Sequence, residues 1–161
     1  MKRSAMLTVM LTVMLDLVGF GIVIPLLTFY GESFQATAED VTLLMSGYSL
    51  AQFIFAPLWG QLSDRIGRRP VLVISVGLTS VFLGLFASAG SLFQLFLFRI
   101  LHGMATANIS TAQACMADLS TRENRARAMG MIGAAFGLGF TIGPVIGGAF
   151  SPDGFGIHGL A

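Results

Sequence analysis

Two ionisable residues lie inside long apolar stretches of the sequence, where a charge is costly. Asp16 interrupts the apolar run at 5–30, and Arg99 lies within another apolar stretch at 92–116. A charged side chain in such a position usually faces a partner or a cavity and marks a path for protons, ions or substrate. Because a medium of low polarity disfavours a charge, Asp16 is the best candidate for a group that responds to protons or cations. Arg99 is then its expected counter-charge or proton-relay partner.

The elements that position these residues follow from the composition. Hydrophobic residues make up 55% of the chain and charged residues 11%, whereas a soluble domain is about 25% charged. The sequence therefore predicts an all-α, polytopic membrane helix bundle within one partial transmembrane domain over 1–161. Five apolar stretches reach the roughly 20 residues that a membrane helix needs. They lie at about 5–30, 41–62, 70–89, 92–116 and 129–150.

The first of these stretches is too long for a signal peptide and contains a carboxylate, so it is interpreted as a membrane helix. Basic residues then alternate along the chain. All of them except Arg99 flank the helices on one side of the membrane, as Lys2, Arg3, Arg65, Arg68, Arg69, Arg122, Arg125 and Arg127. The intervening loops at 31–40, 90–91 and 151–161 contain none. This pattern predicts a cytoplasmic N-terminus in the cell (inner) membrane. The net charge of +1 gives no reason to expect nucleic acid.

Asp16 and Arg99 are expected at similar depths. At ~1.5 Å per residue, Asp16 lies ~17 Å from the cytoplasmic end of the first helix and Arg99 ~20 Å above the cytoplasmic end of the fourth. Both depths are near the midplane of a core that is ~30 Å thick. The alternative interpretation is a structural ion pair that only fixes helix packing.

Polar residues on the fourth predicted helix recur at spacings of three and four, which places them on one face. They are Arg99, His102, Thr106, Ser110 and Gln113. Together with Gln52 on the second helix, this stripe favours a wet cavity in which Gln52, His102, Ser110 and Gln113 contact substrate. Each of these side chains taken singly could instead form a hydrogen bond with a neighbouring helix.

Two further stretches have unusual patterns. The segment GQLSDRIGRRP at 60–70 concentrates charge between two apolar stretches and predicts a short hairpin outside the lipid. The fifth helix is rich in glycine and contains Pro144, which fits either ordinary small-residue packing or a bendable helix at a moving interface. A Pro-x-x-Gly pattern occurs at both 57–60 and 144–147. Helices 2 and 5 would correspond if a three-helix unit were repeated in inverted topology.

These motifs resemble those of the major facilitator superfamily, across all five predicted helices. The signature between helices 2 and 3 is matched by Gly60, Leu62, Asp64, Arg65, Gly67, Arg68 and Arg69. The helix 4 signature is matched by Leu95, Arg99, Gly103 and Ala107, with His102 where Gln is usual. An antiporter signature in helix 5 is matched by Gly139, Gly143, Pro144, Gly147 and Gly148. Leu15, Asp16, Gly19 and Pro25 fit the helix 1 pattern of proton-coupled drug exporters.

Taken together, these motifs resemble those of the tetracycline-exporter-like branch of the major facilitator superfamily. The resemblance implies twelve helices in two six-helix halves that rock around a central site, so we expect this chain to be an N-terminal part whose partner is the missing C-terminal half. It implies proton-coupled efflux of tetracycline-like drugs, with small-molecule substrate, protons and the lipid bilayer as further partners. It also implies a cytoplasmic latch at Gly60, Asp64, Arg65, Gly67, Arg68 and Arg69. No cofactor, metal or enzymatic activity is implied.

Three other classes of membrane protein are alternatives to a drug antiporter. A metabolite or sugar symporter of the same fold is the nearest alternative, and the glycine-proline pattern of helix 5 argues for an antiporter instead. A non-transporting membrane scaffold needs neither intramembrane charges nor a latch. An intramembrane aspartyl protease needs two membrane aspartates, whereas Asp16 is the one aspartate within a predicted span, and this class is rejected.

Overall fold

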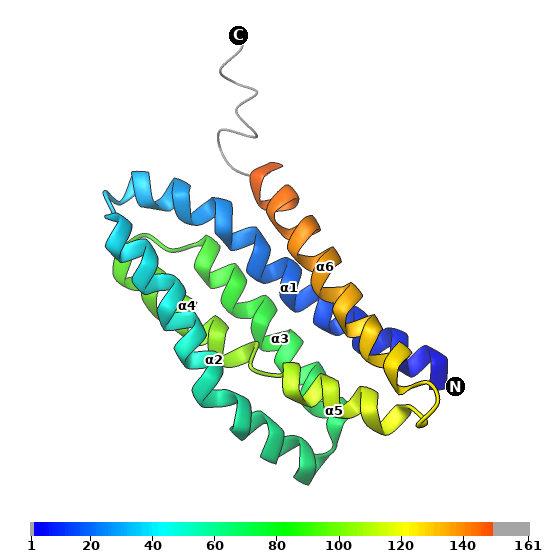
Figure 1. The fold of residues 1–161 in the computed structure, drawn as a ribbon. Helices are drawn as coiled ribbons and strands as arrows, with labels where there is room; N and C mark the ends of the chain where they lie inside the picture. The colour runs from blue at the N-terminus through cyan, green and yellow to red at the C-terminus, as the bar shows by residue number, and fades with distance from the viewer. Residues whose placement is uncertain (1, 150–161) are drawn as a thin grey trace.

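A computed structural model describes residues 2–149, apart from the side chains of 2–3 and 28–33. The predicted outer loop at 151–161 and the predicted helix end at 150 lie outside these residues. The described part is helical: α1 (Lys2–Ser33), α2 (Ala38–Ile66), α3 (Arg68–Ala87), α4 (Leu92–Ala105), α5 (Ile109–Leu119) and α6 (Arg125–Ala149) (Figure 1). These helices form five candidate membrane spans, with α4 and α5 together making the fourth. The predicted all-helical, five-span architecture is confirmed.

The connection between α2 and α3 is shorter than the sequence predicted. Asp64 and Arg65 belong to the last turns of α2, Arg68 and Arg69 begin α3, and only Gly67 lies between the helices. Gly67 has a φ of +98°, a conformation that a residue with a Cβ rarely adopts. The long arginine side chains can reach water from the helix ends, so the charges need no separate loop.

The fourth span is broken, which the sequence did not predict. The helix was expected to be continuous over 92–116, but α4 ends at Ala105 and α5 begins at Ile109. The carbonyl groups released by the break are bonded by side chains from other helices. Trp59 donates to the Met104 carbonyl at 2.7 Å, Ser75 to that of Ala105 at 2.6 Å, and Gln52 to that of Thr106 at 3.1 Å. A broken membrane helix is tolerated where neighbouring helices satisfy the backbone in this way.

The helices pack mainly in two pairs, α1 with α6 and α2 with α4, while α3 lies against α4 (Figure 1). Two apolar clusters fill the bundle. One joins the first half of α1 to α5 and the start of α6, around Val13, Leu17 and Met116. The other joins the second half of α1 to α2 and α4, around Val23 and Leu95. Asp16 and Arg99 lie in the layer between these clusters.

Candidate functional site

The layer between the two apolar clusters is polar and almost inaccessible to solvent. Its buried members come from α1, α3 and both halves of the fourth span, and they are Asp16, Ser75, Thr79, Arg99, His102, Thr106, Asn108 and Thr111. Burying polar groups in an apolar bundle is costly unless they are hydrogen-bonded. The hydrogen bonds of this layer therefore decide what it can do.

Asp16 is held by an amide that the sequence analysis did not single out. Asn108, in the break of the fourth span, donates from Nδ2 to Asp16 Oδ2 at 2.8 Å and also to Ser75 Oγ. Both N–H groups of the amide are then used, which fixes its orientation because the donor side must face the carboxylate. The Thr79 hydroxyl also faces this carboxylate. Asp16 Oδ1 nevertheless has no hydrogen-bond partner of ordinary geometry.

Arg99 lies between aromatic rings. Its guanidinium carbon is 4.3 Å from the centroid of the Tyr48 ring and 5.0 Å from that of Phe20. Nη1 lies 3.3 Å from His102 Nδ1, and Nη2 donates to the Met45 sulfur at 3.5 Å. The residue is fully buried, with 0% of its surface exposed. Ring faces attract a desolvated cation, so the aromatic pair provides part of the stabilisation that a carboxylate would otherwise give.

Asp16 and Arg99 do not form an ion pair with each other. The ion pairs in the described residues both involve Arg68, and neither includes Asp16 or Arg99. The break in the fourth span places Asn108 against Asp16, whereas Arg99 and His102 lie three positions apart within α4. The signal for Asn108 was present in the sequence as an amide inside an apolar stretch.

The residues expected to contact substrate are divided by the same break. Gln52 and Ser110 lie on opposite walls of a groove of about 300 Å³ between α2 and the start of α5. Ser49, Phe53, Ala56, Ala107 and Ile109 complete its lining. His102 is buried, with 1% of its surface exposed, and does not line the groove, and Gln113 is exposed outside it. The lining of the groove is mixed, with the hydroxyl groups of Ser49 and Ser110 and the amide of Gln52 among apolar side chains.

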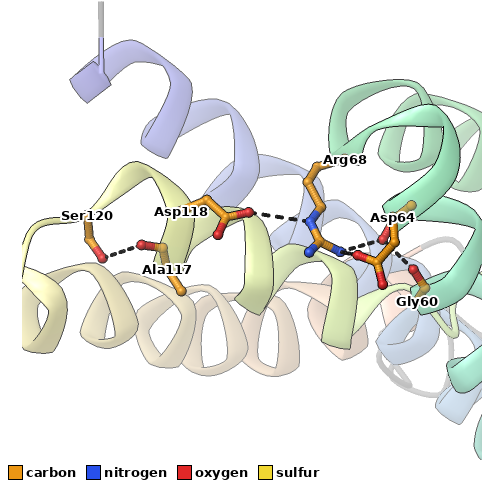
Figure 2. Close-up of polar contacts among 7 residues, drawn as sticks. Gly60, Asp64, Arg68, Ala117, Asp118 and Ser120 are labelled. Carbon is orange, nitrogen blue, oxygen red and sulfur yellow. Dashed lines mark hydrogen bonds and ion pairs between the residues drawn. The ribbon is translucent and has the colours of Figure 1, made fainter.

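Of the expected latch residues, Asp64 in the last turn of α2 contacts Arg68, the first residue of α3. Arg68 pairs with Asp64 at 2.8 Å and with Asp118, near the end of α5, at 3.4 Å (Figure 2). It also donates to Ser63 at 2.6 Å. The cluster thus joins three helices. Asp118 and Ser63 were not predicted as members.

The other predicted latch residues lie around this cluster. The Gly60 carbonyl accepts from the Ser63 hydroxyl at 2.8 Å, and Gly67 forms the turn between α2 and α3. Arg65 and Arg69 are exposed. Figure 2 also shows Ser120 bonded to the Ala117 carbonyl at the end of α5.

The glycines of the predicted antiporter signature lie where α6 crosses α1. A Cβ built on Gly143 would lie 2.7 Å from Gly21 Cα, and one on Gly139 would lie 2.5 Å from Leu17 Cβ. Gly147 similarly abuts the Ile22 backbone. A Cβ built on Gly21 would also lie 2.8 Å from Pro144 Cδ, and Gly148 is partly exposed. This geometry is close small-residue packing, which lets the two backbones approach each other.

Comparison with known proteins gives consistent matches. The family model described as Major Facilitator Superfamily matches residues 9–160. The chain is 39% identical to "Tetracycline resistance protein, class E" of Escherichia coli and 38% identical to the class B protein of the same organism, each over 92% of this chain. It is also 40% identical to "Major facilitator superfamily domain-containing protein 10" of Bos taurus over 69% of this chain.

The chain spans 37% of the length of those two tetracycline resistance proteins and 24% of the Bos taurus protein. The family match extends over all five spans and includes the polar layer, the groove and the Arg68 cluster. The chain therefore belongs to the major facilitator superfamily, a family of membrane transporters and not of enzymes.

Proposed function

We propose that the protein takes part in proton-coupled export, by antiport, of drugs such as tetracycline-like compounds. The observation that carries this proposal is the Asp16 carboxylate, which is buried at 4% exposure with one oxygen bonded to Asn108 and the other without a partner. A carboxylate in this setting can gain and lose a proton with a large effect on its neighbours. The tetracycline resistance proteins among its relatives support the class of substrate.

The broken span gives this proposal a physical mechanism. The groove that contains Gln52 and Ser110 lies on one side of the break, and the site of Asp16 lies on the other. Gln52 bonds to the Thr106 carbonyl, while Asn108 bonds to Asp16. Protonation of Asp16 removes the charge that holds Asn108, so it weakens one support of the break. Substrate in the groove would instead contact both Gln52 and Ser110 and hold the two sides of the break in place, so the proton and the substrate favour different conformations.

The Arg68 cluster supports a latch on the cytoplasmic side of the membrane. Asp64 and Asp118 are 64% and 65% exposed at their side chains, so breaking these pairs rehydrates the charges at little cost. Asp16 and Arg99 form the proposed proton-coupling site, although each has its own partners. The protein would act in the inner membrane together with the C-terminal half found in transporters of this kind.

The test is drug uptake into inverted membrane vesicles that contain the full-length gene product, with and without an uncoupler. Uptake should require the proton gradient, and Asp16→Asn should abolish that dependence because the amide cannot take up the proton. Glu39→Gln is the matched control, since Glu39 is an exposed acid outside the polar layer. Gradient-driven uptake that survives Asp16→Asn would refute the coupling role. Growth on a sole carbon source without drug uptake would instead indicate a symporter.

A further inference from the structure

Aromatic side chains connect α6 to Arg99. The ring of Phe140 on α6 meets that of Phe20 on α1 at a centroid distance of 5.7 Å and an interplanar angle of 82°, which is an edge contact. The Phe20 ring also lies 5.0 Å from the Arg99 guanidinium carbon and 5.0 Å from the centroid of the Tyr48 ring. Edge contacts between rings and cation–ring contacts are both attractive. Phe20 therefore contacts side chains of three other helices.

Phe20 joins parts of the bundle that do not pack on each other. Within residues 2–149, α6 packs against α1 and α5, and not against α2 or α4. Tyr48 and Arg99 lie on α2 and α4. A displacement of α6 can thus reach Arg99 only through the helices between them, and the Phe20 side chain contacts both Phe140 and Arg99.

The backbones of α1 and α6 are in close contact beside these two rings. Phe20 precedes Gly21, and a Cβ built on Gly21 would lie 2.9 Å from Gly143 Cα. Phe140 follows Gly139, where a built Cβ would lie 2.5 Å from a side-chain atom of α1. Close-packed interiors transmit small displacements because they contain little free space. A shift of α6 against α1 will therefore change the contact between the two rings.

Arg99 depends on its ring contacts because no carboxylate pairs with it. The guanidinium is fully buried and takes part in neither of the ion pairs of the described residues. Its Nε has no hydrogen-bond partner. Its Nη atoms contact His102 and the Met45 sulfur, neither of which is an anion. The rings of Phe20 and Tyr48 provide the electrostatic attraction for this charge.

We propose that Phe20 is a positioning residue for Arg99 and makes the place of the guanidinium depend on the position of α6. The Phe20 ring holds the cation and is itself held by Phe140. When α6 moves against α1, the Phe20 ring follows Phe140 and the attraction on Arg99 changes. A ring that only fills space would hold the cation no better than another apolar side chain of the same volume. The consequence for transport rests on the proposed function, in which Arg99 belongs to the proton-coupling site.

A series of fluorinated phenylalanines at position 20 separates holding the cation from filling space. Fluorine withdraws electron density from the ring face and weakens its attraction for a cation, while the size of the ring changes little. Phe20 is replaced in the full-length protein by mono-, di- and trifluorophenylalanine, and denaturant unfolding is measured in detergent. We expect the unfolding equilibrium constant to rise stepwise with each fluorine, by on the order of tenfold over the series.

Phe98 is the matched control position, because its ring is partly buried on α4 and no cation of the described residues lies over it. The same series there should show no stepwise rise. In an Arg99→Met background the series at Phe20 should also be flat. A flat series at Phe20 in the unsubstituted protein, a rise equal to that at Phe98, or a rise that survives Arg99→Met would overturn the proposal. If Arg99→Met does not fold, the comparison with Phe98 decides.

The link to α6 is tested by a double-mutant cycle on the initial rate of drug uptake into inverted vesicles. Phe140→Leu should lower the rate when Phe20 is present and have no further effect in a Phe20→Leu background, because such a cycle isolates the interaction between two sites. Leu138→Ala is the control, since Leu138 is exposed on α6 to the same degree as Phe140, 45% against 44%. Its effect should be the same in both backgrounds. Full additivity of Phe140→Leu and Phe20→Leu would refute the link.

The unfolding series does not depend on transport, so the role of Phe20 and the proposed function can fail separately. Gradient-driven uptake together with a flat series would refute the role of Phe20 and leave the function standing. A stepwise series together with uptake that ignores the proton gradient would refute the function and leave Phe20 as the residue that holds Arg99.

Discussion

At the scale of single residues, Asn108 is the central donor of the polar layer. Its two N–H groups bond Asp16 and Ser75, and Ser75 in turn bonds the Ala105 carbonyl. Removing the amide leaves the buried Asp16 carboxylate without the hydrogen bond from Asn108. The loss of a partner for a buried polar group is more costly than the average worth of a hydrogen bond.

We predict that Asn108→Ala lowers the free energy of unfolding by about 1–3 kcal/mol, measured by thermal or denaturant unfolding in detergent. Ser110→Ala is the control, because Ser110 is exposed and nearby in the same span. The loss should be smaller when Asp16 is also replaced by alanine, since the group that needs the donor is then gone. Equal losses in both backgrounds would show that Asn108 does not act through Asp16.

The sequence predicted the two buried charges, Asp16 and Arg99, but not the side chains that contact them, and the reason is physical. A charge within an apolar run is costly anywhere in a membrane, so Asp16 and Arg99 could be recognised without knowing the fold. Their partners depend on how each helix is rotated about its axis. The aromatic pair around Arg99, Tyr48 and Phe20, comes from two other helices, and no local pattern marks it.

At the scale of elements, the break in the fourth span could not be predicted from its own sequence. Residues 104–108, Met-Ala-Thr-Ala-Asn, contain neither proline nor glycine, the usual causes of a sharp kink. The donors that satisfy the freed carbonyls come from α2 and α3, where Trp59, Gln52 and Ser75 lie far away in the sequence. The break is therefore a property of the packed bundle.

Removing these donors should loosen the break. We predict that Trp59→Phe combined with Gln52→Leu accelerates backbone hydrogen exchange in the peptide that covers the fourth span, since two carbonyls lose their partners. Exchange is measured by mass spectrometry in detergent. Ser49→Ala is the control, because Ser49 bonds the Met45 carbonyl of its own helix. Unchanged exchange in the double variant would mean that the break does not depend on these side chains.

The contact between α1 and α6 also belongs to this scale, and it makes a quantitative prediction. Gly143→Ala should lower the free energy of unfolding by about 1–3 kcal/mol, because its Cβ cannot fit against Gly21 without moving a backbone. Gly137→Ala should be neutral or stabilising by up to about 1 kcal/mol, since nothing lies within 4 Å and alanine favours a helix. Unfolding in detergent measures both. Equal effects would show that the helices are not in close contact at Gly143.

At the scale of the whole molecule, the two main helix pairs are related. Span 1 packs on span 5 (α6), and span 2 (α2) packs on span 4. If span 1 is exchanged with span 4 and span 2 with span 5, the pair of spans 1 and 5 becomes the pair of spans 4 and 2. Each pair contains a glycine pressed against a neighbouring backbone, since Gly103 faces the Tyr48 backbone as Gly143 faces that of Gly21. The Pro-x-x-Gly patterns of α2 and α6 fall on the exchanged helices. The packing therefore supports the hypothesis of an inverted repeat.

The distribution of charge over the bundle predicts how it sits in the membrane. The Arg68 cluster lies at the ends of α2 and α5. The connection between α5 and α6 adds Arg122, and the first turn of α6 adds Arg125 and Arg127. The connections at 34–37 and 88–91 contain no basic residue. Short cytoplasmic loops are enriched in Lys and Arg, so the Arg68 end should face the cytoplasm. The sequence alone is sufficient for this prediction because it depends on which loops carry charge and not on side-chain contacts.

Reporter fusions test this orientation directly. Alkaline phosphatase, which is active only outside the cytoplasm, should be active when joined after Gly90 and inactive when joined after Gly67. A fluorescent protein that matures only in the cytoplasm should give the opposite result at the two positions. Each junction is thus the control for the other, and protein levels are compared by immunoblot. Activity of the phosphatase after Gly67 would place the Arg68 cluster outside and would remove the physical basis for a cytoplasmic latch.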